Sequence, residues 1–234
     1  MRPFETLAGV TTPDGRRLTL HHRDGDYFIH LDGDELMASR APRSEAALAE
    51  LGCGHLAAAE GSRTLIGGLG LGYTLRAALR VLPRRAEVVV AEIFPAVVAW
   101  NRTHLTDLHA RALEDPRVRV HEGDVRTLLA SGGRFDAILL DVDNGPAAWC
   151  LESNGRLYDR AGLARIRQAL APGGVLAVWS AERDLAFLKQ LDKSGFDARA
   201  EIVRSRGDRG SKHTIFVARV EPGGGEGRRG RGSG

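Results

Sequence analysis

Short apolar runs alternate with stretches of helical periodicity over most of the chain, from about residue 64 to residue 220. Two of the runs, Val88-Val89-Val90 and Ile138-Leu139-Leu140, contain no polar residue. Uninterrupted runs of this kind are typical of strands that helices cover on both faces. Between them, apolar residues recur three and four positions apart, as on one face of an amphipathic helix. The alternation predicts a parallel sheet with helical crossovers.

The strand and helix bounds follow from these two periodicities. The expected strands are 64–66, 88–91, 117–120, 137–140, 175–179, 198–203 and 214–220. The expected helices are 44–52, which Gly52 should end, and 73–82, 96–108, 125–129, 161–170 and 185–193. A polar loop, 205–211, joins the last two strands, so we expect these to be antiparallel neighbours. Five parallel strands, a sixth and an antiparallel seventh are the order of the Rossmann-like, class I methyltransferase-type α/β fold.

The first 40 residues have a different pattern, with short strand-like runs between turn signals. Asp24-Gly25 and Asp32-Gly33 are preferred dipeptides for tight hairpins. The expected strands are 6–12, 16–22, 27–31 and 35–39, which form a small β-meander. Because such a sheet is too small to be stable alone, we expect it to pack on the following domain and on a second subunit in a homodimer.

Composition and charge indicate the domain bounds and the kind of partner to expect. A chain of 234 residues with 43% hydrophobic content can bury one sizeable core. We expect an N-terminal β region at 1–43, the Rossmann-like domain at 44–221, and a disordered glycine- and arginine-rich tail at 222–234. The net charge is +3, and three arginines against one glutamate in the last twelve residues supply +2 of it. Without a basic stripe on the body, a nucleic-acid partner is not expected.

Cysteine spacing and hydropathy suggest the compartment. Cys53 and Cys150 form neither a metal-ligand spacing nor a disulfide framework, which fits a reducing cytoplasm. No apolar run approaches the roughly 18 residues of a membrane span, and no apolar stretch of a signal peptide follows the first three residues. We expect a cytoplasmic protein without a membrane segment or a metal.

The stretch from Thr64 to Gly72 carries the clearest chemical signal. Its glycines lie between a predicted strand and a helix N-terminus, where they allow a sharp turn and close approach of a ligand. The next strand ends at Glu92, about 20 residues further on, where nucleotide-binding βαβ units place an acid that accepts hydrogen bonds from ribose. The predicted nucleoside-binding residues here are Gly67, Gly68, Gly70, Gly72 and Glu92.

Further acids follow the later strands, at the edge of the sheet where α/β proteins bind ligands. Asp124 precedes a predicted helix, which it can cap while also binding an adenine amino group. Asp141 ends an apolar run, and Asp143 follows two residues later in a loop with Gly145-Pro146. Two close carboxylates can hold an ammonium group, or one can take its proton while the other holds the charge. We predict that Asp141 accepts the proton and Asp143 holds the charge.

The chain resembles the spermidine synthase family of polyamine aminopropyltransferases over most of its length. The resemblance rests on the small N-terminal β region, the glycine loop, Glu92 and three further motifs: Asp115-Pro116-Arg117-Val118 followed by Gly123-Asp124, Phe135-Asp136-Ala137-Ile138 running to Asp141, and Leu157-Tyr158. It implies that Glu92 holds the ribose, Asp124 the adenine and Asp141 the attacking amine. The implied co-substrate is decarboxylated S-adenosylmethionine, and the implied acceptor is a small amine such as putrescine.

The sequence also departs from the family pattern. The acidic loop is about two residues shorter, Arg43-Ser44-Glu45 replaces a Tyr-His-Glu triplet, and Met37 stands near a usual glutamine. Three functions therefore stay open. They are aminopropyl transfer from decarboxylated S-adenosylmethionine, methyl transfer from S-adenosylmethionine, and nucleoside binding without catalysis.

Overall fold

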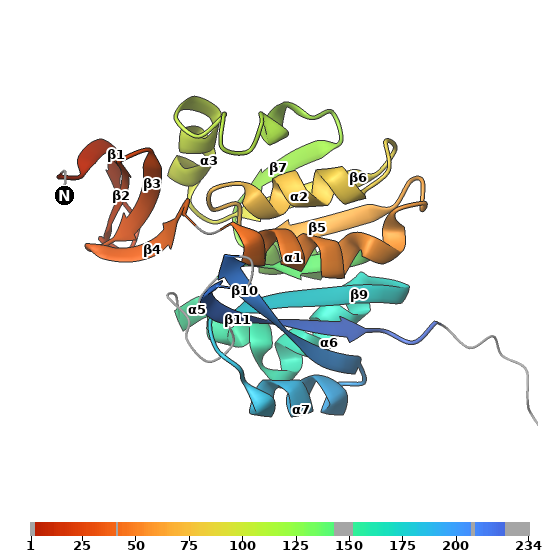
Figure 1. Cartoon of the computed structure of the whole chain (residues 1–234). Helices are drawn as coiled ribbons and strands as arrows, with labels where there is room; N and C mark the ends of the chain where they lie inside the picture. Colours follow the sequence, from red (N-terminus) through yellow and green to blue (C-terminus); the bar gives the residue numbers. More distant parts are fainter. Residues whose placement is uncertain (1–2, 41, 143–151, 207–208, 223–234) are drawn as a thin grey trace, which may run out of the picture.

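The computed structural model describes residues 3–40, 42–142, 152–206 and 209–222, which form two sheets (Figure 1). The larger sheet has the order β10-β11-β9-β8-β5-β6-β7, and β11 runs antiparallel to both of its neighbours. The other strands run parallel, which confirms the predicted fold class. The strands are β5 (Arg63–Gly67), β6 (Glu87–Glu92), β7 (Val118–Glu122), β8 (Phe135–Leu140), β9 (Leu170–Ser180), β10 (Asp197–Arg206) and β11 (Arg209–Arg219).

Helices cover both faces of this sheet, with α1 and α2 on one side and α6 and α7 on the other (Figure 1). Alternate residues of β8 serve the two cores, because Leu139 packs with the α1 side and Ile138 with the α6 side. None of the helices in the described part of the chain has the length and apolar character to span a membrane. The helices are α1 (Arg43–Cys53), α2 (Tyr73–Val81), α3 (Pro95–Thr103), α4 (Val125–Ala130), α5 (Glu152–Tyr158), α6 (Arg160–Ala169) and α7 (Leu185–Lys193), with 3₁₀ turns at Gly54–Leu56 and Ala112–Glu114.

The N-terminal residues form a separate antiparallel sheet in the order β1-β2-β3-β4. Its tight turns have left-handed backbones at Asp24-Gly25 and Asp32-Gly33, as two-residue hairpins of this kind require. The inner face, including Leu18 and Ile29, belongs to the same core cluster as α1 and α2, so the sheet packs on the larger domain as predicted. Its strands are β1 (Glu5–Thr11), β2 (Arg17–Arg23), β3 (Asp26–Leu31) and β4 (Asp34–Ala38).

Two predicted helix ends are wrong. Gly52 does not end α1, which continues to Cys53; instead, a Cβ at Gly52 would lie 2.1 Å from the Leu139 side chain. This glycine is needed because the helix backbone packs directly against β8. The predicted helix 96–108 ends at Thr103, because the chain then turns to place Leu105, which is fully buried, in the core.

Three other segments differ from the prediction. The strand expected at 175–179 begins earlier, because β9 already starts at Leu170 and carries a register shift against β8 before Val175. The expected polar loop 205–211 is largely strand, because β10 reaches Arg206 and β11 begins at Arg209. The short helix α5 (Glu152–Tyr158) has no predicted counterpart, and seven residues that include glycine and asparagine give only a weak helical pattern.

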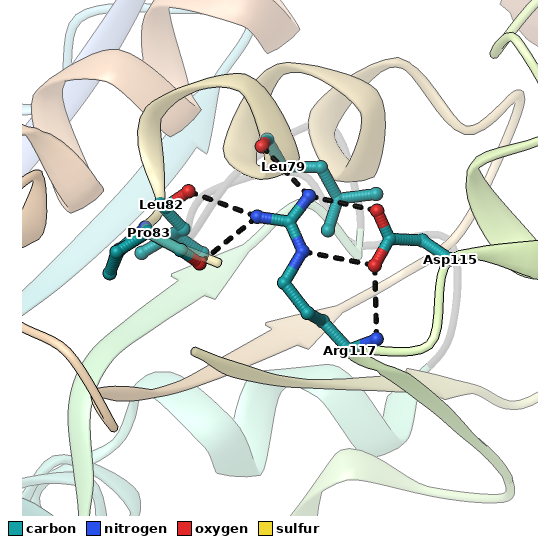
Figure 2. A network of polar contacts seen from close by, with 5 residues as sticks. All are labelled: Leu79, Leu82, Pro83, Asp115 and Arg117. Atoms are coloured by element: carbon teal, nitrogen blue, oxygen red, sulfur yellow. Dashed lines mark hydrogen bonds and ion pairs between the residues drawn. The ribbon is translucent and has the colours of Figure 1, made fainter. Parts of the chain in front are cut away.

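Arg117 joins the edge strand β7 to the end of α2, as Figure 2 shows. Its guanidinium donates to the carbonyl oxygens of Leu79, Leu82 and Pro83 at 2.9–3.1 Å. It also forms a two-pronged ion pair with Asp115, which holds the pKa of that carboxyl below its usual value. Helix C-terminal carbonyls lack partners within the helix, so the arginine satisfies them. The Asp-Pro-Arg-Val motif thus has a structural role in this chain.

Candidate active site

The glycine loop after β5 packs closely against two neighbouring segments. Gly68, Gly70 and Gly72 all have positive φ angles. A Cβ at Gly68 would lie 2.2 Å from the Asp141 carbonyl oxygen, and a Cβ at Gly70 would lie 2.8 Å from the Met37 sulfur. These glycines are therefore required by the packing of the loop between β8 and β4, in addition to any ligand that approaches it.

Glu92, the last residue of β6, ties this loop to the sheet. It is 6% exposed, and its two carboxylate oxygens accept hydrogen bonds from the amides of Leu69 and Phe94 at 2.9 and 3.0 Å. Burial raises the pKa of Glu92, and the amide donors act against this rise because they favour the charged form. The carboxylate lies against the cavity described below.

Asp124 has the capping role that the sequence predicts. Its carboxylate accepts a hydrogen bond from the Arg126 amide at 2.8 Å and pairs with the Arg126 guanidinium. Burial acts to raise the pKa of Asp124, but the bonds from Arg126 outweigh it, and the pKa is lowered. The residue is thus an ionised helix cap at the edge of the same cavity.

Asp141 follows β8 and accepts a hydrogen bond from the Thr74 hydroxyl at 2.9 Å. Burial, followed by the charge of Glu45, raises the pKa of Asp141 to about 7. Burial likewise raises the pKa of Glu45, whose carboxylate accepts a 2.6 Å hydrogen bond from the Ser44 hydroxyl. The sequence did not place Glu45 among the site residues. The available signal was that, of the Tyr-His-Glu triplet, this chain keeps only the glutamate.

These residues surround one cavity of about 330 Å³. It lies at the carboxyl ends of β5, β6, β7 and β8, and β4 closes one side with Leu36 and Met37. Among the lining residues that the structure describes, there is no lysine or arginine. The lining contains the predicted residues Gly68, Gly70, Glu92, Asp124 and Asp141. Gly67 and Gly72 are not in the lining, and they pack against Leu140 and His109.

The β10–β11 hairpin closes the far side of the cavity. β11 pairs with β9 only from Thr214 onwards but with β10 as far as Arg209, so the hairpin projects past the end of β9. His213 therefore reaches the cavity, where its ring lies 4.9 Å from that of Trp179, and burial lowers its pKa. The sequence did not indicate either residue, and His213 reaches the cavity only because of this overhang.

Asp143 and the Gly145-Pro146 turn lie outside the described residues. In the described ranges, no group of three or more histidine, cysteine, aspartate or glutamate side chains is arranged to hold a metal ion.

Comparison with known proteins places this geometry in context. No protein-family model matches the chain. The polyamine aminopropyltransferase of Nitrosomonas europaea is 38% identical over 119 residues, 50% of this chain and 34% of that protein. The polyamine aminopropyltransferase of Mycobacterium tuberculosis is 36% identical over 127 residues, 52% of this chain and 23% of that protein. The matches thus span about a third or less of these relatives. They confirm the resemblance to the spermidine synthase family.

Solved structures agree on the fold. A spermidine synthase in complex with the transition state analogue AdoDATO has a TM-score of 0.73 and 17% identity, covering 93% of this chain and 73% of that chain. The spermidine synthase of Thermotoga maritima gives the same values. At this identity the likeness concerns the fold, including the small N-terminal sheet beside the larger domain.

Proposed function

We propose that this chain transfers an aminopropyl group from decarboxylated S-adenosylmethionine to an amine such as putrescine. The observation that carries the proposal is the cavity beside Glu92 and Asp141, whose described lining has carboxylates and no lysine or arginine. A sulfonium and an ammonium are both cations, so such a lining attracts them. The carboxylate of S-adenosylmethionine would be repelled. Similarity to polyamine aminopropyltransferases supports the same reaction.

In this proposal, Glu92 and Asp124 bind the nucleoside. The Glu92 carboxylate accepts hydrogen bonds from the Leu69 and Phe94 amides and borders the cavity, where a ribose hydroxyl can donate to it. Asp124 stays ionised beside Arg126, and the remaining lone pair on its Oδ1 is suited to the adenine amino group. The glycine loop between them lets the backbone approach the ligand closely.

Asp141 would accept the proton of the attacking amine. A primary amine is mostly protonated at neutral pH and attacks only as the neutral form. A carboxyl with a pKa of about 7 is half ionised near that pH and can take the proton. The nitrogen then forms a bond to the carbon next to sulfur, the carbon–sulfur bond breaks, and its electron pair stays on a neutral thioether.

The test is mass spectrometry of purified protein incubated with putrescine or spermidine and each sulfonium compound. The expected result is an aminopropyl adduct formed only with decarboxylated S-adenosylmethionine. Asp141→Asn should lower turnover by a factor on the order of 100 to 10,000, since it removes one positioned base, with little change in co-substrate affinity by calorimetry.

Each alternative has its own outcome in this experiment. A methyl adduct from S-adenosylmethionine would identify a methyltransferase. Consumption of neither compound by the wild type, despite adenosine binding, would identify a nucleoside-binding protein without catalysis. Asp143 stays a prediction as the charge holder, as do the cytoplasmic location, the homodimer and a reaction without a metal.

A further inference from the structure

The reaction above assigns no task to two cavity carboxylates, Glu35 and Glu45. Glu35 is exposed and paired with Arg40, which leaves Glu45. It lies in the first turn of α1 and lines the cavity together with Asp141. Each of the two carboxylates accepts a hydrogen bond from a buried hydroxyl, Ser44 for Glu45 and Thr74 for Asp141. The hydroxyls belong to α1 and α2, which pack side by side (Figure 1). Two neighbouring helices thus orient two acids at one wall of the cavity.

We propose that Glu45 and Asp141 form a paired carboxylate site that binds the nitrogen of the acceptor amine, with Glu45 as the charge holder. The inference rests on the proposed function and assigns to Glu45 the task predicted above for Asp143. The described lining supplies the pair with no cationic side chain, so a bound ammonium would be its counter-ion.

The surroundings of the pair support this assignment. The other titratable side chains that line the cavity are Tyr73 on α2, His213 on β11, Glu35 on β4, Glu92 and Asp124. Glu92 is bonded to backbone amides and Asp124 to Arg126, while burial keeps His213 neutral near pH 7. Burial and then Glu45 raise the pKa of the Tyr73 phenol, so this ring also stays uncharged.

A helix-end role alone does not explain Glu45. An acid in the first turn of a helix is stabilised in its charged form by the helix dipole, which lowers its pKa. Here burial dominates and raises the pKa of Glu45. A carboxylate kept in a site that disfavours its charge is more typical of a binding site than of a solvated helix end.

The pair also accounts for where the protons go. In the free protein, burial and the charge of Glu45 favour the protonated form of Asp141. Binding of the ammonium displaces that proton, and Asp141 then takes one proton from the nitrogen. After the nitrogen–carbon bond forms and the carbon–sulfur bond breaks, the nitrogen is a secondary ammonium. Glu45 holds this charge until the product leaves.

The test uses Glu45→Gln, which keeps the side-chain volume and an oxygen that can accept the Ser44 bond. In protein with ¹³C-labelled aspartate carboxyls, with the Asp141 signal assigned through Asp141→Asn, the Asp141 titration midpoint should fall by about half a pH unit or more. Calorimetry should show putrescine binding weakened about tenfold. Glu50→Gln, on the exposed side of the same helix, should change neither quantity.

The inference is overturned if Glu45→Gln leaves both the Asp141 midpoint and putrescine affinity unchanged. It is also overturned if Asp143→Asn weakens putrescine binding and Glu45→Gln does not. Glu45→Asp, which keeps the charge, should retain more affinity than Glu45→Gln, as mere loss of packing would not predict. Neither measurement needs turnover, so absence of aminopropyl transfer would defeat the proposed function and leave this test intact.

Discussion

At the scale of single residues, Glu92 both holds the glycine loop in place and faces the proposed ligand. Its carboxylate accepts hydrogen bonds from the Leu69 and Phe94 amides and still borders the cavity. A buried acid with two amide donors costs less to keep charged than an unbonded one. The residue therefore prepares the glycine loop in the shape that the nucleoside would meet.

Glu92→Ala should weaken binding of adenosyl compounds at least tenfold, because it removes charge-assisted hydrogen bonds worth about 1.5 to 3 kcal/mol each. Calorimetry with the two sulfonium compounds and adenosine measures this. Glu87→Ala is the matched control, since Glu87 begins the same strand and forms only half-exposed ion pairs with Arg63 and Arg119. Equal affinities for the Glu92 variant and the wild type would contradict the ribose assignment.

At the scale of elements, the edge strand β7 and helix α2 are held together by one side chain. Arg117 reaches three carbonyl oxygens at the end of α2 while it is paired with Asp115 (Figure 2). Its side chain is 16% exposed, so these bonds are largely shielded from water. A planar guanidinium can satisfy this many acceptors, whereas a lysine ammonium cannot.

Arg117→Lys should lower the free energy of unfolding by about 2 kcal/mol, since it leaves helix-end carbonyls without a donor. Urea denaturation measures the loss. Arg119→Lys, two residues further along the chain and within β7, should cost less than about 0.5 kcal/mol, because that side chain is 78% exposed. Similar losses for both variants would show that the Arg117 hydrogen bonds contribute little to the free energy of unfolding.

At the scale of the whole molecule, Asp141 links the cavity to stability. An aspartate carboxyl has an ordinary pKa of 3.8, and in the folded protein the pKa of Asp141 is about 7. Between these pH values, the folded protein keeps a proton that the unfolded chain releases. The free energy of unfolding therefore decreases as pH rises through this window, by at most about 1.4 kcal/mol per pH unit.

Asp141→Asn should remove this contribution. Denaturation at a series of pH values from 4 to 8 should show that the variant gains stability relative to the wild type as pH rises, with the difference levelling off above pH 7. Taking the difference between the two proteins cancels the opposite contributions of Asp115 and Asp124, whose pKa values are lowered. Parallel curves would mean that Asp141 titrates as an ordinary exposed acid.

Much of this architecture follows from local sequence. Apolar runs, glycines and capping residues act over a few positions, so α7 (Leu185–Lys193) has the predicted bounds, and both Asp-Gly turns form where expected. The acids at strand ends are also predictable, because parallel strands bring their carboxyl ends to one edge. Gly52 shows the limit, since a helix-ending glycine and a glycine required by contact with Leu139 look alike in the sequence.

By itself, the sequence determined the order and type of most elements, the edge of the sheet that carries the site, and the residues Glu92, Asp124 and Asp141. Only the tertiary structure decided which side chains share the cavity. Glu45 lies near Asp141 because of how α1 is rotated and packed against α2 and the sheet. His213 reaches the cavity because its hairpin extends past β9. Both depend on contacts between segments far apart in the chain, which no local pattern encodes.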